Sequence, residues 1–174
     1  MVEPFEMAAE EYAPVSFETV RPISVSVVRK DAERDLALLR FEEEIDISVP
    51  DHILGRAHDA PVGISLACLG YPFGYKGLYN QVVFRAVLAS KILTPKENRI
   101  LLFDTMVFDG MRGGPLVNLH DGRVIGIICG RFHPSDVTGQ GEDEAITNGG
   151  TNLSFAVSVE YGRSLLEAEG LEST

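Results

Sequence analysis

One stretch of the sequence decides the fold. It reads Asp109-Gly110-Met111-Arg112-Gly113-Gly114-Pro115-Leu116-Val117-Asn118 and continues, after a short gap, as Gly122-Arg123-Val124-Ile125-Gly126-Ile127. Glycine adopts backbone conformations that other residues avoid, so the segment before Pro115 can fold tightly enough to aim two backbone N–H groups at one point. The apolar residues on either side of His120-Asp121-Gly122 predict two strands joined there, because Asp-Gly tolerates the positive φ of a tight hairpin.

Short apolar segments separated by turn residues lie on both sides of this stretch. Ile23, Val25 and Val27 alternate with serines, which is the period of a half-buried strand. Further strands are predicted at residues 36–39, 62–69, 81–88, 99–103, 115–118 and 124–128. This succession favours an antiparallel sandwich or barrel. Helices are predicted only at residues 5–12 and 160–169. The acidic, proline-bearing stretch 41–61 suits a linker.

Composition narrows the classes of function. The 174 residues fit one domain or two very small ones, and the 45% hydrophobic and 24% charged fractions are those of a globular protein. A formal net charge of -11 argues against a nucleic-acid partner, since phosphates would repel such a surface. No apolar run reaches the roughly 18 residues of a membrane span, and residues 1–6 show no signal-peptide pattern. We therefore expect no membrane association and a cytoplasmic location.

The two cysteines and the remaining motifs give no reason to expect a cofactor or a metal. Cys68 and Cys129 lie in unrelated apolar surroundings, without a CxxC pattern or a histidine at metal-ligand spacing. They fit two buried, reduced thiols, with a disulfide as the alternative.

The quoted stretch resembles the nucleophile region of trypsin-like serine peptidases, above all their HtrA/DegP-type branch. That region reads Gly-x-Ser-Gly-Gly-Pro-Leu, then a turn, then a Val-Ile-Gly-Ile strand. Three further segments match in the family's order. Residues 31–39 resemble the segment of the triad aspartate, residues 70–74 resemble a Gly-x-Pro-Phe-Gly turn, and residues 152–157 resemble the closing strand before a terminal helix. The likeness runs from about residue 17 to residue 166.

The resemblance implies an all-β fold, an antiparallel double β-barrel of the trypsin-like peptidase type with a short C-terminal helix. We expect an acidic, helical N-terminal segment at 1–16, a partial first barrel and linker at 17–59, and a second barrel with the helix at 60–174. An incomplete first barrel exposes an unpaired edge. Either codons upstream of Met1 supply the missing strands, or residues 1–16, a partner chain or a second copy cover the edge.

The resemblance also assigns site residues, and two catalytic groups are absent. Asp35 is the counterpart of the triad acid, the Gly110 backbone that of an oxyanion-hole donor, and Arg112 stands at the nucleophile position. A guanidinium is permanently cationic and has no lone pair for attack on a carbonyl. No histidine precedes His52, so the base is missing as well. The implied substrate pocket is lined by Ile128, Cys129, Gly130, Ser154 and Phe155.

Three functions stay open at this point. The first is an inactive peptidase homologue that binds peptide or a protein partner. The second is an active serine-type endopeptidase, if the chain is truncated or Arg112 is not native. The third is a structural or interaction module. The set His133, Ser135 and Asp136 does not replace the triad, because triads assemble from distant segments. Two outcomes stay open for Arg112: its side chain extends into solvent, or it spans the cleft and pairs with a partly buried Asp35.

Overall fold

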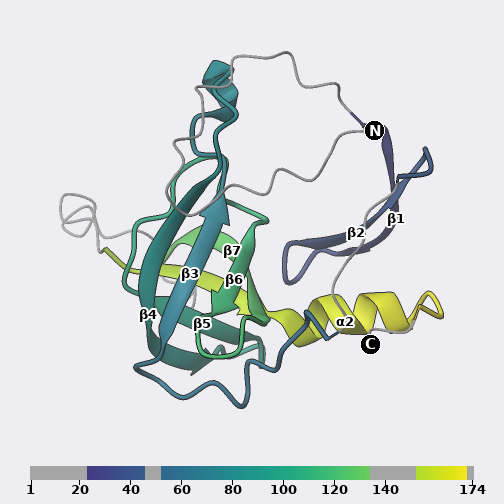
Figure 1. Cartoon of the computed structure of the whole chain (residues 1–174). Helices are drawn as coiled ribbons and strands as arrows, with labels where there is room; N and C mark the ends of the chain where they lie inside the picture. Colours follow the sequence, from purple (N-terminus) through teal and green to yellow (C-terminus); the bar gives the residue numbers. More distant parts are fainter. Residues whose placement is uncertain (1–22, 46–51, 134–151, 172–174) are drawn as a thin grey trace.

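A closed barrel of six antiparallel strands forms the larger part of the structure (Figure 1). The computed structural model describes residues 23–45, 52–133 and 152–171. The strands follow one another around the barrel in the order β3-β4-β5-β8-β7-β6, and β3 pairs with β6 to close it. Their bounds are β3 Ser65–Gly70, β4 Val82–Leu93, β5 Arg99–Phe103, β6 Pro115–Asn118, β7 Val124–Arg131 and β8 Ser154–Ser158. The predicted all-β, antiparallel fold is confirmed.

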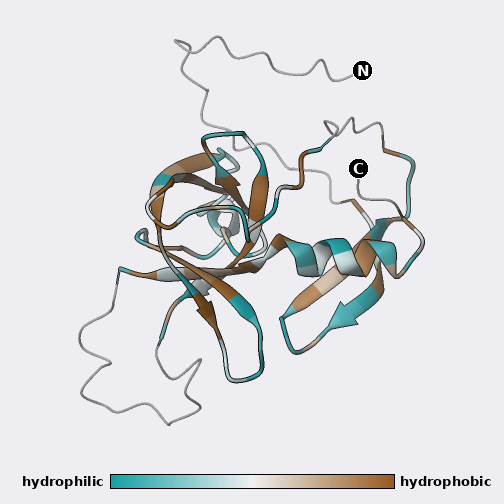
Figure 2. Ribbon diagram, turned by 90° about the horizontal axis from the view of Figure 1, so that it is seen from below, coloured by the Kyte–Doolittle hydropathy of each residue, from teal (hydrophilic) through white to brown (hydrophobic). Residues whose placement is uncertain are grey.

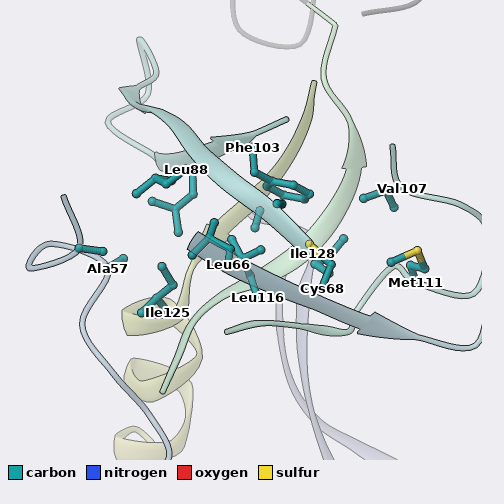
Figure 3. Close-up of a cluster of buried hydrophobic side chains, with 14 residues drawn as sticks. Ala57, Leu66, Cys68, Leu88, Phe103, Val107, Met111, Leu116, Ile125 and Ile128 are labelled. Carbon is teal, nitrogen blue, oxygen red and sulfur yellow. The ribbon is translucent and has the colours of Figure 1, made fainter. Parts of the chain in front are cut away.

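The barrel interior is filled by side chains that alternate along the strands (Figure 3). Leu66 and Cys68 on β3 and Leu88 on β4 are fully buried, and along β4 the exposed residues alternate with less exposed ones. Buried members of this core cluster on the other strands and loops include Phe103, Val107, Met111, Leu116, Ile125 and Ile128. Truncating one such leucine to alanine costs about 2–5 kcal/mol, because the rigid barrel wall cannot close the cavity left behind.

The β6–β7 turn has the predicted hairpin geometry. Gly122 has φ 73°, and Asn118 and Arg123 bridge the two strands through an N–H···O=C bond of 2.8 Å. The sequence therefore places the hairpin correctly. This turn also fixes how β6 and β7 lie next to each other.

Residues 23–45, at the start of the described structure, form a separate two-stranded sheet. Strands β1 Val25–Asp31 and β2 Leu36–Phe41 pair antiparallel. The helix α2 Val159–Glu167 follows β8 directly and contacts β2 on one side and β7 on the other. Figure 2 shows this helix running out from the barrel alongside the β1–β2 sheet. The side chains of Arg29 on β1 and Glu169, just after α2, form an ion pair that joins the small sheet to the C-terminal end of the helix.

One face of this small sheet is apolar and exposed. Val25 pairs with Phe41 and Val27 with Leu39, and these four side chains, which we call the open face, are 43–52% exposed. The strand predicted at residues 23–27 begins at Val25 and is not half-buried as expected. The reason is that no second layer of described residues covers this side of the sheet, whereas Leu36 on the other side packs toward the helix.

Other boundaries differ from prediction by a few residues. The third strand begins at Ser65, the fourth extends to Leu93, and the terminal helix begins at Val159. Residues 52–60, predicted as linker, lie on the barrel: Leu54 bridges to Val124, and Ala57 and Ala60 are buried. The helix predicted at residues 5–12 lies outside the described residues. Within the described ranges, no helix has both the length and the apolar character needed to cross a bilayer.

Candidate functional site

Five of the eight predicted site residues line a cavity of about 690 Å³ on one side of the barrel. Asp35 comes from the β1–β2 turn, Arg112 from the loop before β6, and Cys129 and Gly130 from the end of β7, while Phe155 lies on β8. The other lining residues are Glu33, Arg34, Thr94, Pro95, Lys96, Asn98, Ile100, Arg131, His133 and Val157. The fold thus brings together side chains that are far apart in the sequence.

The loop before β6 is held rigidly against the turn that follows β3. The N–H of Tyr71 donates to the carbonyl of Gly110 at 3.0 Å. Gly110 has φ 88°, and a Cβ atom there would lie 2.2 Å from the carbonyl oxygen of Tyr71. Only glycine fits this position. The next side chain, Met111, is completely buried in the barrel core and anchors the loop.

The loop uses some of its backbone donors and leaves two unused. The N–H groups of Met111, Gly113 and Gly114 each donate to a backbone carbonyl, at 3.1, 2.7 and 3.0 Å. Within the described residues, the N–H groups of Gly110 and Arg112 have no hydrogen-bond acceptor. These are the two donors that the resemblance assigns to an oxyanion hole, and of the two residues Arg112 lines the cavity.

Arg112 lies along the cavity wall and does not cross it. A Cβ atom placed at Gly130 would lie 3.3 Å from the guanidinium carbon of Arg112, so the guanidinium rests against the backbone of β7. The expected ion pair between Arg112 and Asp35 does not form: in the described part of the chain, the side-chain ion pairs are Arg29–Glu169 and Arg34–Asp31. Asp35 is exposed, so its carboxylate stays hydrated and needs no partner.

The β1–β2 turn fixes the direction of Asp35. Its φ of 53° lies in the left-handed region, which aspartate tolerates better than most residues. Asp31 holds the turn through bonds to the N–H groups of Glu33 and Arg34 and an ion pair with Arg34 at 2.8 Å. Partial burial raises the pKa of Asp31, but the hydrogen bonds and charge of Arg34 outweigh this, and the net pKa is lowered. The Arg34 guanidinium also stacks over the Tyr161 ring at 4.3 Å.

The thiol of Cys129 is poorly suited to nucleophilic attack. Cys129 lies at a bulge in β7, where the register with β8 shifts, and its Sγ donates to the carbonyl of Ile127 at 3.5 Å. Burial raises its pKa and is the largest effect. A hydrogen bond with the Val157 backbone offsets part of this, the Asp35 carboxylate raises the pKa again, Arg112 lowers it, and the net pKa is raised. The thiol is therefore protonated at neutral pH. Cys68 is buried, with a pKa of about 12, and both cysteines are free, which excludes the disulfide alternative.

Two residues assigned to the pocket face the barrel interior instead. Ile128 belongs to the core cluster, and the buried Ser154 hydroxyl accepts the N–H of Val107 at 3.1 Å. Successive side chains on a strand point to opposite faces, so Phe155 reaches the cavity while its neighbour Ser154 does not. Ser154 and Ile128 support the wall from behind.

Arg131, the last residue of β7, and His133, which follows that strand, also line the cavity. Two further cavity residues, Lys96 and Asn98, come from the β4–β5 turn and were not predicted to line it. A turn sequence does not say which cavity it borders, so no local signal singles these residues out. Ser135 and Asp136, considered with His133, lie outside the described residues. Among those described, no group of three or more His, Cys, Asp or Glu side chains is arranged to hold a metal ion.

Fold and cleft together define a class of protein, and comparison with known families agrees. Residues 5–127 match the model of the trypsin-like peptidase domain, and the chain belongs to this family. Relatives and solved structures place it on the HtrA-like branch.

Two curated relatives are described as probable periplasmic serine endoproteases, DegP-like. The one from Halomonas elongata is 32% identical over 115 residues, which cover 65% of this chain and 23% of that protein. The one from Pseudomonas fluorescens is 30% identical over 107 residues, which cover 60% and 21%. The matched part of the chain thus spans less than a quarter of the length of these relatives.

Similar solved structures include the HtrA-type protease AlgW. Its structure with a decapeptide aligns with a TM-score of 0.62 at 24% identity, covering 85% of this chain and 41% of that one. Its structure with a tripeptide aligns with a TM-score of 0.59 at 24% identity, covering 83% and 42%.

Proposed function

We propose that this chain is a non-catalytic member of the trypsin-like family that binds a peptide, or an extended segment of a partner protein, in its cleft. The observation that carries the proposal is the position of Arg112. It stands where the family has its nucleophile, and it lines an open cavity of about 690 Å³. Its own N–H and that of Gly110 have no acceptor among the described residues. A guanidinium cannot attack a carbonyl, whereas it can bind one or a carboxylate.

The other groups at the cavity do not replace the missing nucleophile. Among the described residues that line it there is no serine. Cys129 carries a protonated thiol, for the reasons given above. The hydroxyl of Thr94 accepts the N–H of Asn98 at 3.0 Å and so closes its own turn. Each of these side chains has a structural partner and none is activated for attack.

The end of β7 supports binding of an extended peptide. Its residues Gly130 and Arg131 pair with β8 on one side. On the other side the pairing with β6 ends at Ile127, so this part of β7 is free toward the cavity. An added strand can pair with such an edge, and side-chain pockets then select the sequence. The unused N–H groups of Gly110 and Arg112 offer further contacts to the peptide backbone.

The test is to measure turnover and binding with the same purified chain. We expect no cleavage of casein and no labelling by a fluorophosphonate, together with saturable binding of peptides from a varied panel. Casein cleavage that is abolished by serine-directed inhibitors would establish the active endopeptidase instead. If the chain neither cleaves casein nor binds peptides, the third function, a structural or interaction module, is favoured.

A further inference from the structure

We propose that the cleft selects a peptide carboxylate, and that Arg112 is its principal ligand. The inference rests on the proposed function, because it names the chemistry that the peptide-binding cleft prefers. The carboxylate is that of a glutamate or aspartate side chain, or that of a peptide C-terminus. Both offer the same planar pair of oxygens to a guanidinium.

The charge of the cavity differs in sign from that of the chain. The whole sequence carries a formal net charge of -11. The described residues that line the cavity include four cationic side chains, Arg34, Lys96, Arg112 and Arg131, against two carboxylates, Glu33 and Asp35. A local excess of cations in an acidic protein attracts anionic groups, and the low-dielectric walls of a cleft strengthen that attraction.

Most of the cationic charge is not neutralised within the cavity. Arg34 is the exception, since it pairs with Asp31. Arg131 donates to the sulfur of Met106 at 2.8 Å, a weak acceptor that leaves its charge uncompensated. In the described part of the chain, the side chains of Lys96 and Arg112 have no ion-pair partner. Three cations are therefore available to a ligand.

Arg112 is the best placed of the three. Its guanidinium lies flat against Gly130, where the missing side chain makes room for it, so part of the conformational freedom of Arg112 is already lost. A carboxylate on the cavity side can accept two parallel N–H bonds from this fork. The unused N–H groups of Gly110 and Arg112 belong to the same loop and strengthen the preference for an oxygen anion there.

The two carboxylates of the cavity limit where the anion can bind. Glu33 accepts a bond from the side-chain amide of Asn98 at 3.5 Å, and Asp35 lies on the β1–β2 side. A second acidic group next to Asp35 would be repelled. The cleft should therefore accept one acidic residue at the Arg112 wall and disfavour another on the β1–β2 side, which distinguishes recognition from general attraction to polyanions.

The experiment uses the full chain and a panel of amidated decapeptides of varied sequence, each made in a glutamate and a glutamine version. Fluorescence anisotropy gives the affinity of each pair. We expect glutamate peptides to bind about 10- to 100-fold more tightly, the range for a hydrogen-bonded charge in a partly desolvated site. Glutamine versions with a free C-terminal carboxylate show whether the terminus can supply the anion.

The matched variants are Arg112→Gln and Arg40→Gln. Both remove one positive charge, but Arg40 is exposed on β2 and does not line the cavity. We expect the glutamate preference to disappear in Arg112→Gln and to persist in Arg40→Gln. Equal affinities for glutamate and glutamine peptides in the wild-type chain would overturn this inference while leaving peptide binding intact. An equal loss of the glutamate preference in both variants would show that net charge, and not Arg112, sets the preference, and would also overturn the inference. Failure of every peptide to bind would overturn the proposed function as well.

Discussion

Gly110→Ala is the substitution that most sharply tests how the site loop is built. The new Cβ would lie 2.2 Å from the carbonyl oxygen of Tyr71, about 1 Å or more short of ordinary van der Waals contact. The obstacle is backbone and cannot rotate away. The φ of 88° adds strain of about 1–2 kcal/mol, and overpacking adds about 1–3 kcal/mol. We therefore expect a loss of about 2–5 kcal/mol in the free energy of unfolding.

Gly77→Ala provides the matched control. Gly77 has a similar φ of 77°, but a Cβ atom there would meet nothing within 4 Å. Gly77 also lies outside the cavity. Its cost should be the strain alone, about 1–2 kcal/mol. Urea denaturation gives both values, and anisotropy gives peptide affinity. We expect only Gly110→Ala to weaken binding, because the loop must move. Equal destabilisation by the two substitutions, with unchanged affinity in both, would refute the reasoning.

Three further predictions concern chemistry and association. Arg112→Ser should not restore peptidase activity, because the family's base position holds no histidine in this chain and His133, which lines the cavity, lies elsewhere in the sequence. Casein cleavage by this variant would show that a base is present. Cys129 should react slowly with a disulfide reagent at pH 7, since burial and Asp35 raise the pKa of its thiol and the thiolate forms only at higher pH. Asp35→Asn should lower that pKa and speed the reaction. An unchanged pH profile of the reaction rate in this variant would contradict the prediction. The open face should promote self-association, so Leu39→Lys should weaken any concentration-dependent dimer seen by analytical ultracentrifugation, and an unaffected dimer would exclude this face.

The sequence predicted the barrel because local rules govern it. The apolar segments with turn residues between them, the Asp-Gly turn at residue 122 and the glycines before Pro115 each constrain the backbone within a few residues. These patterns alone left a sandwich or a barrel open. The likeness to a known family decided for the barrel and assigned Asp35, Arg112 and Phe155 to one cleft.

What the sequence missed depends on contacts between distant segments. The direction of Arg112 follows from space left at Gly130 on another strand, and the wall formed by Lys96 follows from the register of β4 with β5. The exposure of the open face depends on whether another layer covers it, which an alternating pattern cannot reveal. Side-chain direction and coverage are tertiary properties, so they appeared only with the structure.

The most direct test of the central claim is the fate of a peptide held in the cleft. The full chain is incubated with a tightly bound glutamate peptide, the complex is isolated, and the peptide is analysed by mass spectrometry over time. We predict stoichiometric, saturable binding with the peptide recovered intact, because the loop supplies donors and a cation but no nucleophile. Cleavage products that accumulate with time and are blocked by a fluorophosphonate would contradict the account.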